Sequence, residues 1–224
     1  MDRRLLCRTA LLAASATLLG LVFLDRPIAE WLHASGFENA AFFSLGLATL
    51  DIGSGLRFWV WLAGFAVLFL GIIGVALLRH ARWSRICVVA AIVQLACIAT
   101  MIALKDVFGR LRPEQVLESG DWSHVWFAGG TSFPSGHSAF YFGLCLPFAA
   151  ACRNRWLRGM LLAIPLYVAL ARIDLARHFL SDVAASALMA ALYALLVGRL
   201  AQRWLPAQGV ADPASIRPSP DGSG

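Results

Sequence analysis

The sequence predicts an all-α membrane protein, a bundle of six transmembrane helices with an interfacial amphipathic segment between the first and second. Three observations carry this prediction. The 224 residues are 59% hydrophobic and only 14% charged, whereas soluble domains carry about a quarter charged residues. Six long apolar runs follow one another along the chain, and clusters of arginine occupy every second connection between them. This pattern is typical of a helical bundle that crosses the membrane repeatedly.

The six predicted spans are the longest apolar stretches of the chain. They cover residues 5–24, 58–78, 86–104, 138–152, 159–171 and 183–204. A hydrocarbon core about 30 Å thick requires about 20 helical residues. The fourth and fifth runs are shorter than that, so we expect their helices to extend into the flanking residues. No polar tract is long enough for a soluble domain, and residues 1–205 are therefore predicted to form one membrane domain.

Basic residues predict the orientation of the bundle. Arginine clusters precede the first span, join the second to the third, join the fourth to the fifth, and close the sixth. Such clusters stay on the cytoplasmic side, so both termini are expected in the cytoplasm. The connections 25–57, 105–137 and 172–182 then face outward.

The segments that flank the spans have their own character. The first apolar run resembles a signal peptide, but no small-residue cleavage site follows it, and we expect a retained helix. Residues 25–57 mix aromatic and acidic side chains, which predicts one or two amphipathic helices at the interface. Tryptophans near the span ends, Trp126 among them, are expected to be interface anchors. The tail 206–224, rich in Pro, Ser, Gly and Asp, is predicted to be a disordered cytoplasmic segment.

Composition also argues against several classes of protein. The net charge of +6 is spread over small clusters between apolar runs, so the basic face of a nucleic-acid-binding protein is not expected. The five cysteines include no Cys-x-x-Cys pair, and neither a disulfide framework nor a zinc site is predicted.

The first polar island begins at Lys105, the single lysine of the chain. Lys105 and Arg112 are seven residues apart and would share a face if the stretch were helical, although Gly109 and Pro113 disfavour a continuous helix. A lysine and an arginine together suit a phosphate. The alternative is snorkelling of a basic side chain at a span end, which explains Arg110 well and Lys105 less well.

The second island is the stretch from Gly129 to His137, directly before the fourth span. Glycines there would let the backbone approach a ligand closely. The N–H groups of Ser135, Gly136 and His137 would lie at a helix N-terminus, which favours anions. Taken alone, His137 would more often be a helix cap or an interface residue.

The third island contains Arg172, His178 and Asp182. The histidine and the aspartate are four residues apart, which places both on one helix face. An aspartate that accepts from one imidazole nitrogen leaves the other nitrogen free to attack. Alternatively, the pair is a structural hydrogen bond and Arg172 a snorkelling side chain.

All three islands fall on the same side of the membrane, which favours phosphoryl transfer. One histidine would attack phosphorus and the other would protonate the leaving oxygen, while the basic residues stabilise the equatorial oxygens. No clustered metal-ligand pattern is present, so no metal and no cofactor are expected. Asp121 and His124 are candidate ligands but fit ordinary loop residues better.

These islands resemble the motifs of the type 2 phosphatidic acid phosphatase (PAP2) superfamily, whose site is related to that of the vanadium haloperoxidases. The family's Lys-x6-Arg-Pro motif matches Lys105 through Pro113, and its Pro-Ser-Gly-His motif matches 134–137. Its Ser-Arg-x5-His-x3-Asp motif matches 172–182 in spacing, with Ala171 in place of the usual serine.

The resemblance implies a role for each matched position. His178 would be the nucleophile that forms a phosphohistidine, Asp182 would orient it, and His137 would be the general acid. The phosphate ligands would be Lys105, Arg112, Ser135, Gly136 and Arg172. Members of this kind are metal-independent lipid phosphatases of six helices with the site at the outer face.

The substrate is expected to be a membrane lipid phosphate or diphosphate. Undecaprenyl diphosphate, phosphatidylglycerol phosphate, phosphatidic acid and lipid A are the bacterial candidates, and residues 109–114 and 178–183 look somewhat like the lipid A branch. Two alternatives stay open: a phosphotransferase that uses the same site, and a transporter or channel with polar residues along a pathway. Oligomeric state is not predicted.

Overall fold

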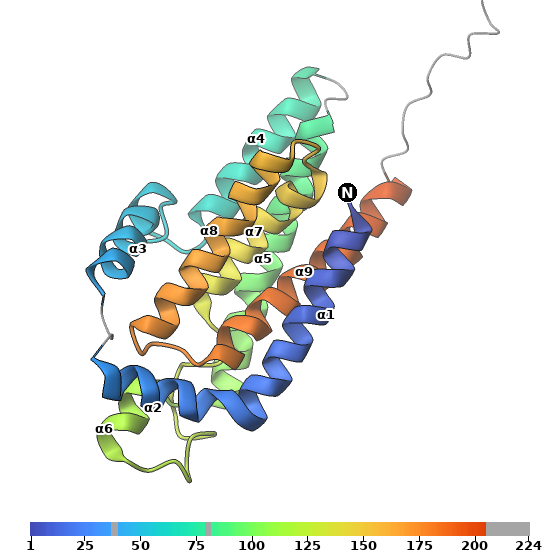
Figure 1. The fold of residues 1–224 in the computed structure, drawn as a ribbon. Helices are drawn as coiled ribbons and strands as arrows, with labels where there is room; N and C mark the ends of the chain where they lie inside the picture. Colours follow the sequence, from blue (N-terminus) through green and yellow to red (C-terminus); the bar gives the residue numbers. More distant parts are fainter. Residues whose placement is uncertain (37–39, 79–81, 205–224) are drawn as a thin grey trace, which may run out of the picture.

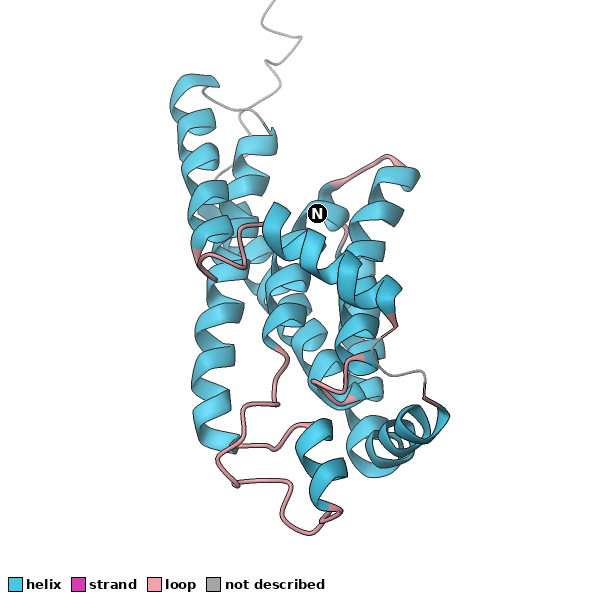
Figure 2. Cartoon of the chain, turned by 90° about the vertical axis from the view of Figure 1, so that its left-hand side faces the viewer, coloured by secondary structure: helices cyan, strands magenta, loops and turns pink. Residues whose placement is uncertain are grey.

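The computed structural model describes residues 1–36, 40–78 and 82–204, which form helices and connecting loops without a strand (Figure 2). The elements in chain order are α1 (Arg3–Leu19), the π-helical turn η1 (Gly20–Leu24), α2 (Asp25–Ser35), α3 (Ala41–Gly53), α4 (Leu62–Leu78), α5 (Arg82–Phe108), α6 (Pro113–Ser119), α7 (Gly136–Ala151), α8 (Arg155–Asp174) and α9 (Leu180–Trp204). The all-α prediction is confirmed. The predicted tail 206–224 lies outside the described residues.

Each of the six predicted apolar runs is helical, as α1, α4, α5, α7, α8 and α9. Among the described residues, four stretches are long and apolar enough to cross a membrane: Arg3–Ser35, Trp83–Ser119, Arg155–Asp174 and Leu180–Gln202. Helix α7 has 16 residues and helix α4 has 17, fewer than the about 20 that a span requires. The six-span arrangement therefore stays a prediction, as does the interfacial position of the segment that contains α2 and α3.

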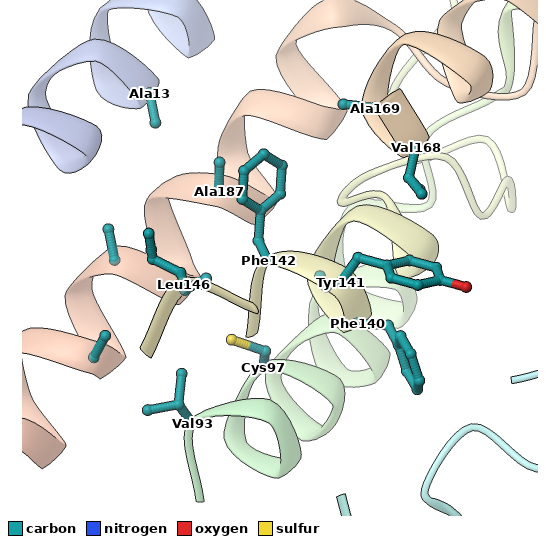
Figure 3. Close-up of a cluster of buried hydrophobic side chains, with 14 of the residues drawn as sticks. Ala13, Val93, Cys97, Phe140, Tyr141, Phe142, Leu146, Val168, Ala169 and Ala187 are labelled. Carbon is teal, nitrogen blue, oxygen red and sulfur yellow. The ribbon is translucent and has the colours of Figure 1, made fainter. Parts of the chain in front are cut away.

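Helix α7 occupies the centre of the bundle, where it packs against α5, α8 and α9, while α1 lies along α9 and α4 along α5 (Figure 1). Phe142 and Leu146 of α7 lie in the core near Cys97 of α5 and Ala187 of α9 (Figure 3). A Cβ at Gly143 would lie 3.0 Å from the Cα of Gln94. Small residues at such contacts let apolar helices approach closely, which replaces hydrophobic driving force inside a membrane.

The bundle has two chemically distinct ends. At one end the start of α1 meets the ends of α7 and α9, because Asp2 N–H donates to the carbonyl of Ala150 and Arg3 donates to Gln202. The start of α5, the connection between α7 and α8 and the end of α9 also lie at this end (Figure 1). At the opposite end the π-helical turn redirects the chain from α1 into α2, which lies across the bundle beside α6 (Figure 1). All three polar islands lie at that second end.

Candidate active site

The first and second islands meet at Thr131, not along one helix. Helix α5 ends at Phe108, Gly109 adopts a φ of +48°, and Pro113 opens α6, so Lys105 and Arg112 do not share a helical face. Instead, Lys105 Nζ donates to the carbonyl of Thr131, and Arg112 Nη2 donates to Thr131 Oγ1 over 3.3 Å. The loop between α6 and α7 thus brings the two cations together.

That loop is held by backbone contacts with residues 109–111. Gly130 N–H donates to Gly109 O over 2.9 Å, and Ser132 N–H donates to Arg110 O over 2.8 Å. A Cβ at Gly130 would lie 2.2 Å from the carbonyl oxygen of Arg110. Gly130 therefore lets two loop backbones lie close together. The close approach is to the chain itself, whereas the sequence predicted an approach to a ligand.

The N-terminus of α7 carries the Pro-Ser-Gly-His stretch. Ser135 caps the helix, since its hydroxyl accepts from Ser138 N–H, but its own N–H donates to the carbonyl of Asp182 over 3.2 Å. The expectation that this N–H faces an anion is wrong. In the described part of the chain, no acceptor is found for the N–H groups of Gly136 and His137, which leaves two donors at the positive end of α7.

His178 lies in the loop before α9, with its side chain buried. Its Nδ1 lies 2.8 Å from the carbonyl of Ser132 and 3.6 Å from Asp182 Oδ2. A carbonyl only accepts, so Nδ1 carries the proton and Nε2 keeps its lone pair. Asp182, expected to be the direct partner of His178, is the more distant of these two groups, and it also accepts from Ser132 Oγ over 2.5 Å and from Phe179 N–H over 2.9 Å. It therefore fixes the two segments that orient the ring.

Burial keeps His178 uncharged. The pKa of His178 is lowered to about 4. Loss of solvent is the largest cause, Arg172 and Lys105 act in the same direction, and Asp182 opposes them. An imidazole with such a pKa is neutral at neutral pH. A neutral ring with a fixed tautomer is the form in which histidine attacks an electrophile.

Three cations gather beside this ring. Lys105 interacts electrostatically with Arg112 and Arg172, and Arg172 with Arg112. Like charges held together repel one another unless an anion lies between them. The buried Nε of Arg172 has no acceptor among the described residues. A polyanionic group such as phosphate would supply both the acceptor and the compensating charge.

Arg110, interpreted from the sequence as a snorkelling side chain, is instead buried, with 4% of its surface exposed. Nη1 donates to Ser181 Oγ over 2.7 Å and also to Asp182, while Nη2 donates to Asp25 Oδ2 over 2.7 Å. Its guanidinium lies 4.4 Å from the Trp126 ring centroid and 4.1 Å from that of Phe179. Trp126, expected to be an interface anchor, thus also packs against Arg110.

His137 has an acidic partner that the sequence reasoning did not predict. Its Nε2 lies 3.0 Å from Asp51 Oδ2, a residue of α3 that is 86 positions earlier in the chain. No motif spacing marks this pair. Asp51 belongs to the segment 25–57, whose sequence predicts an interfacial amphipathic helix, and a carboxylate on the polar face of such a helix needs no partner.

Asp121 and His124 form a local network with Ser123, and the His124 side chain is 83% exposed. This agrees with their interpretation as ordinary loop residues. Within the described ranges, no group of three or more His, Cys, Asp or Glu side chains gathers.

A helical bundle with apolar stretches, a buried histidine and a cluster of cations at one end is an arrangement suited to phosphoryl transfer at a membrane. The profile of the PAP2 superfamily matches residues 82–206, more than half of the chain, and the protein belongs to this superfamily. It is 27% identical over 198 residues to the lipid A 1-phosphatase of Rhizobium johnstonii, covering 81% of this chain and 75% of that protein. No solved structure matched the chain. The protein is therefore a phosphoric-ester hydrolase of the lipid phosphatase type.

Proposed function

We propose that the protein removes phosphate from a membrane lipid through a phosphohistidine on His178. The observation that carries the proposal is the buried, neutral His178, whose Nδ1–H is bound to Ser132 O beside Lys105, Arg112 and Arg172. Nε2 would form a bond to phosphorus while the bond from phosphorus to the lipid oxygen breaks. The three cations and the N–H of Gly136 would hold the phosphate oxygens.

His137 would complete the cycle as general acid and base. It would give a proton to the leaving lipid oxygen, then take one from the water that attacks the phosphohistidine and releases inorganic phosphate. Asp182 would support the nucleophile through Ser132 and Phe179. The missing hydroxyl at Ala171 removes none of these groups, so we expect the mechanism to be retained.

A lipid A-type 1-phosphate is the first substrate to test, because the similar protein of Rhizobium johnstonii is a lipid A 1-phosphatase. Undecaprenyl diphosphate, phosphatidylglycerol phosphate and phosphatidic acid follow. We place the six-helix domain in the bacterial inner membrane with both termini in the cytoplasm and the site facing the periplasm. The start of α5, the connection between α7 and α8 and the end of α9, which carry Arg85, Arg153 and Arg199, lie at the end of the bundle opposite the site (Figure 1), which supports this orientation.

The test is phosphate release from this panel by purified protein in excess chelator. His178→Ala should abolish release and the acid-labile phosphoryl label on the protein, whereas His124→Ala, which alters an exposed histidine, should retain both. Release by His178→Ala at the wild-type rate would refute the nucleophile. Product analysis separates hydrolysis, which yields inorganic phosphate, from a phosphotransferase, which yields a phosphorylated acceptor.

A further inference from the structure

Asp51 lies near the end of α3, in the part of the chain that precedes the family match. Its Oδ2 is 3.0 Å from His137 Nε2, and its Oδ1 accepts from the Tyr141 hydroxyl over 3.2 Å. The Tyr141 hydroxyl also lies 3.0 Å from Ser54 Oγ. Both carboxylate oxygens are thus engaged, and 17% of the side chain is exposed. A carboxylate with two fixed partners holds its own orientation and that of the ring it binds.

Helix α3 is anchored firmly enough to position this carboxylate. The Tyr167 hydroxyl of α8 donates to the carbonyl of Phe42 over 2.7 Å, and its ring packs against Phe42 and Phe43. Ala40 N–H donates to Asp174 Oδ2 over 3.1 Å. The first half of α3 is therefore bound to α8, and this docking determines the position of Asp51.

The Asp51–His137 pair lies close to the cation cluster and lines a cavity. Asp51 interacts electrostatically with Arg172, one of the three cations proposed to bind phosphate. The cavity has a volume of about 410 Å³, and its further lining consists of the apolar side chains of Leu47, Ala48, Leu56 and Leu175 together with Ser44 and Arg57. The pair thus adjoins both a phosphate-binding candidate and a cavity with partly apolar walls.

We propose that Asp51 is a positioning residue for the general acid His137, and that the adjoining cavity receives the first part of the leaving lipid. This inference rests on the proposed function. Because Nε2–H is bound to Asp51, the proton that His137 delivers is the one on Nδ1. As the phosphorus–oxygen bond breaks and the bond to His178 Nε2 forms, that proton moves to the leaving oxygen. The Asp51 carboxylate stabilises the imidazolium before the transfer.

The test compares two phosphate monoesters that differ in their need for a general acid. Cleavage of an alkyl phosphate expels an alkoxide, which needs a proton, whereas cleavage of a nitrophenyl phosphate with the same alkyl chain expels a stable phenolate. Asp51→Asn should lower kcat/KM, which reports the steps up to loss of the leaving group, about 100-fold on the alkyl phosphate, the lower end of a general-acid contribution. It should change kcat/KM on the aryl phosphate about 3-fold or less.

Asp121→Asn is the matched control, since Asp121 is also a carboxylate beside a histidine but lies in an exposed loop; it should leave both rates unchanged. In a His137→Ala background, Asp51→Asn should cause no further loss, because the two residues act as one unit. If Asp51→Asn does not fold, as judged by thermal unfolding in detergent, Tyr141→Phe carries the same comparison with a smaller effect.

Equal losses of kcat/KM on the two substrates would show a structural role and overturn the inference, as would an unchanged kcat/KM on the alkyl phosphate. Failure of the proposed function looks different. There the wild-type protein would release no phosphate from either monoester, or His178→Ala would retain activity. If His178→Ala is inactive on both while Asp51→Asn behaves as wild type, only the role of Asp51 fails.

Discussion

Replacing Arg110 with methionine would leave two buried carboxylates without their shared counter-charge. Asp25 and Asp182 have side chains that are 7% and 0% exposed, and both pair with the same guanidinium. Methionine fills a similar volume but donates no hydrogen bond. Removing one partner of a buried ion pair lowers the free energy of unfolding by about 3–5 kcal/mol. Since this arginine serves two acids, we expect a loss at the upper end of that range.

The measurement is unfolding in mixed detergent micelles, followed by loss of helical circular dichroism. Arg26→Met is the matched control, because Arg26 pairs with Glu30 on the exposed side of α2 with side chains 62% and 45% exposed, and such pairs contribute about 0–1 kcal/mol. Adding Asp25→Asn to the Arg110→Met protein should restore part of the stability by removing one unpaired charge. Equal stability of the Arg110→Met and Arg26→Met proteins would refute the reasoning.

The remaining predictions concern Gly130, Lys105 and His178. Gly130→Ala should lower stability and phosphatase activity together, because its Cβ would meet a backbone oxygen at 2.2 Å, whereas Gly159→Ala, with open space around it, should change neither in the same assays. Lys105→Ala should lower turnover at least about 100-fold while leaving membrane insertion intact, as judged by phosphate release and membrane fractionation; full activity would return Lys105 to a snorkelling role. The pKa of His178 is lowered to about 4 from an ordinary value of 6.5, so below pH 6.5 the unfolded chain binds a proton that the folded chain does not. The stability advantage linked to the neutral ring is therefore complete above pH 6.5 and is lost as pH falls toward 4. The difference in unfolding free energy between the wild type and His178→Asn should shrink by about 3 kcal/mol over this interval, and a constant difference would contradict the buried neutral ring.

Sequence spacing predicted which basic and imidazole groups would assemble, because those groups lie at the ends of consecutive helices on one side of the bundle. Apolar run length and the alternation of arginine clusters suffice to place Lys105, His137 and His178 at the same end. The local geometry was harder to predict. The acceptor for His178 Nδ1 is the backbone carbonyl of Ser132. Since every residue has a backbone carbonyl, the residue types do not show which one accepts this hydrogen bond.

The acidic partners could not be predicted at all from periodicity. Asp25 and Asp51 occur among aromatic residues in a segment whose pattern indicates a surface helix, and an interfacial helix would leave both carboxylates in water. Their burial depends on how α2 folds back from the π-helical turn and how α3 docks on α8. Asp25 meets Ser181 across 156 positions of the chain, and Asp51 meets His137 across 86. No pattern within a helix encodes contacts over such separations.

These two acids change the account of what the N-terminal part of the chain does. The family match begins at residue 82, yet Asp25 holds Arg110 and Asp51 holds His137 within the matched region. Arg110 in turn binds Asp182, which accepts from the Ser132 hydroxyl, and the Ser132 carbonyl fixes the tautomer of His178. A continuous set of polar contacts therefore runs from α2 to His178, the proposed nucleophile, and a second contact runs from α3 to His137, the proposed general acid. Because these contacts hold the motif side chains in place, Asp25 and Asp51 belong to the structure of the candidate site together with the motif residues.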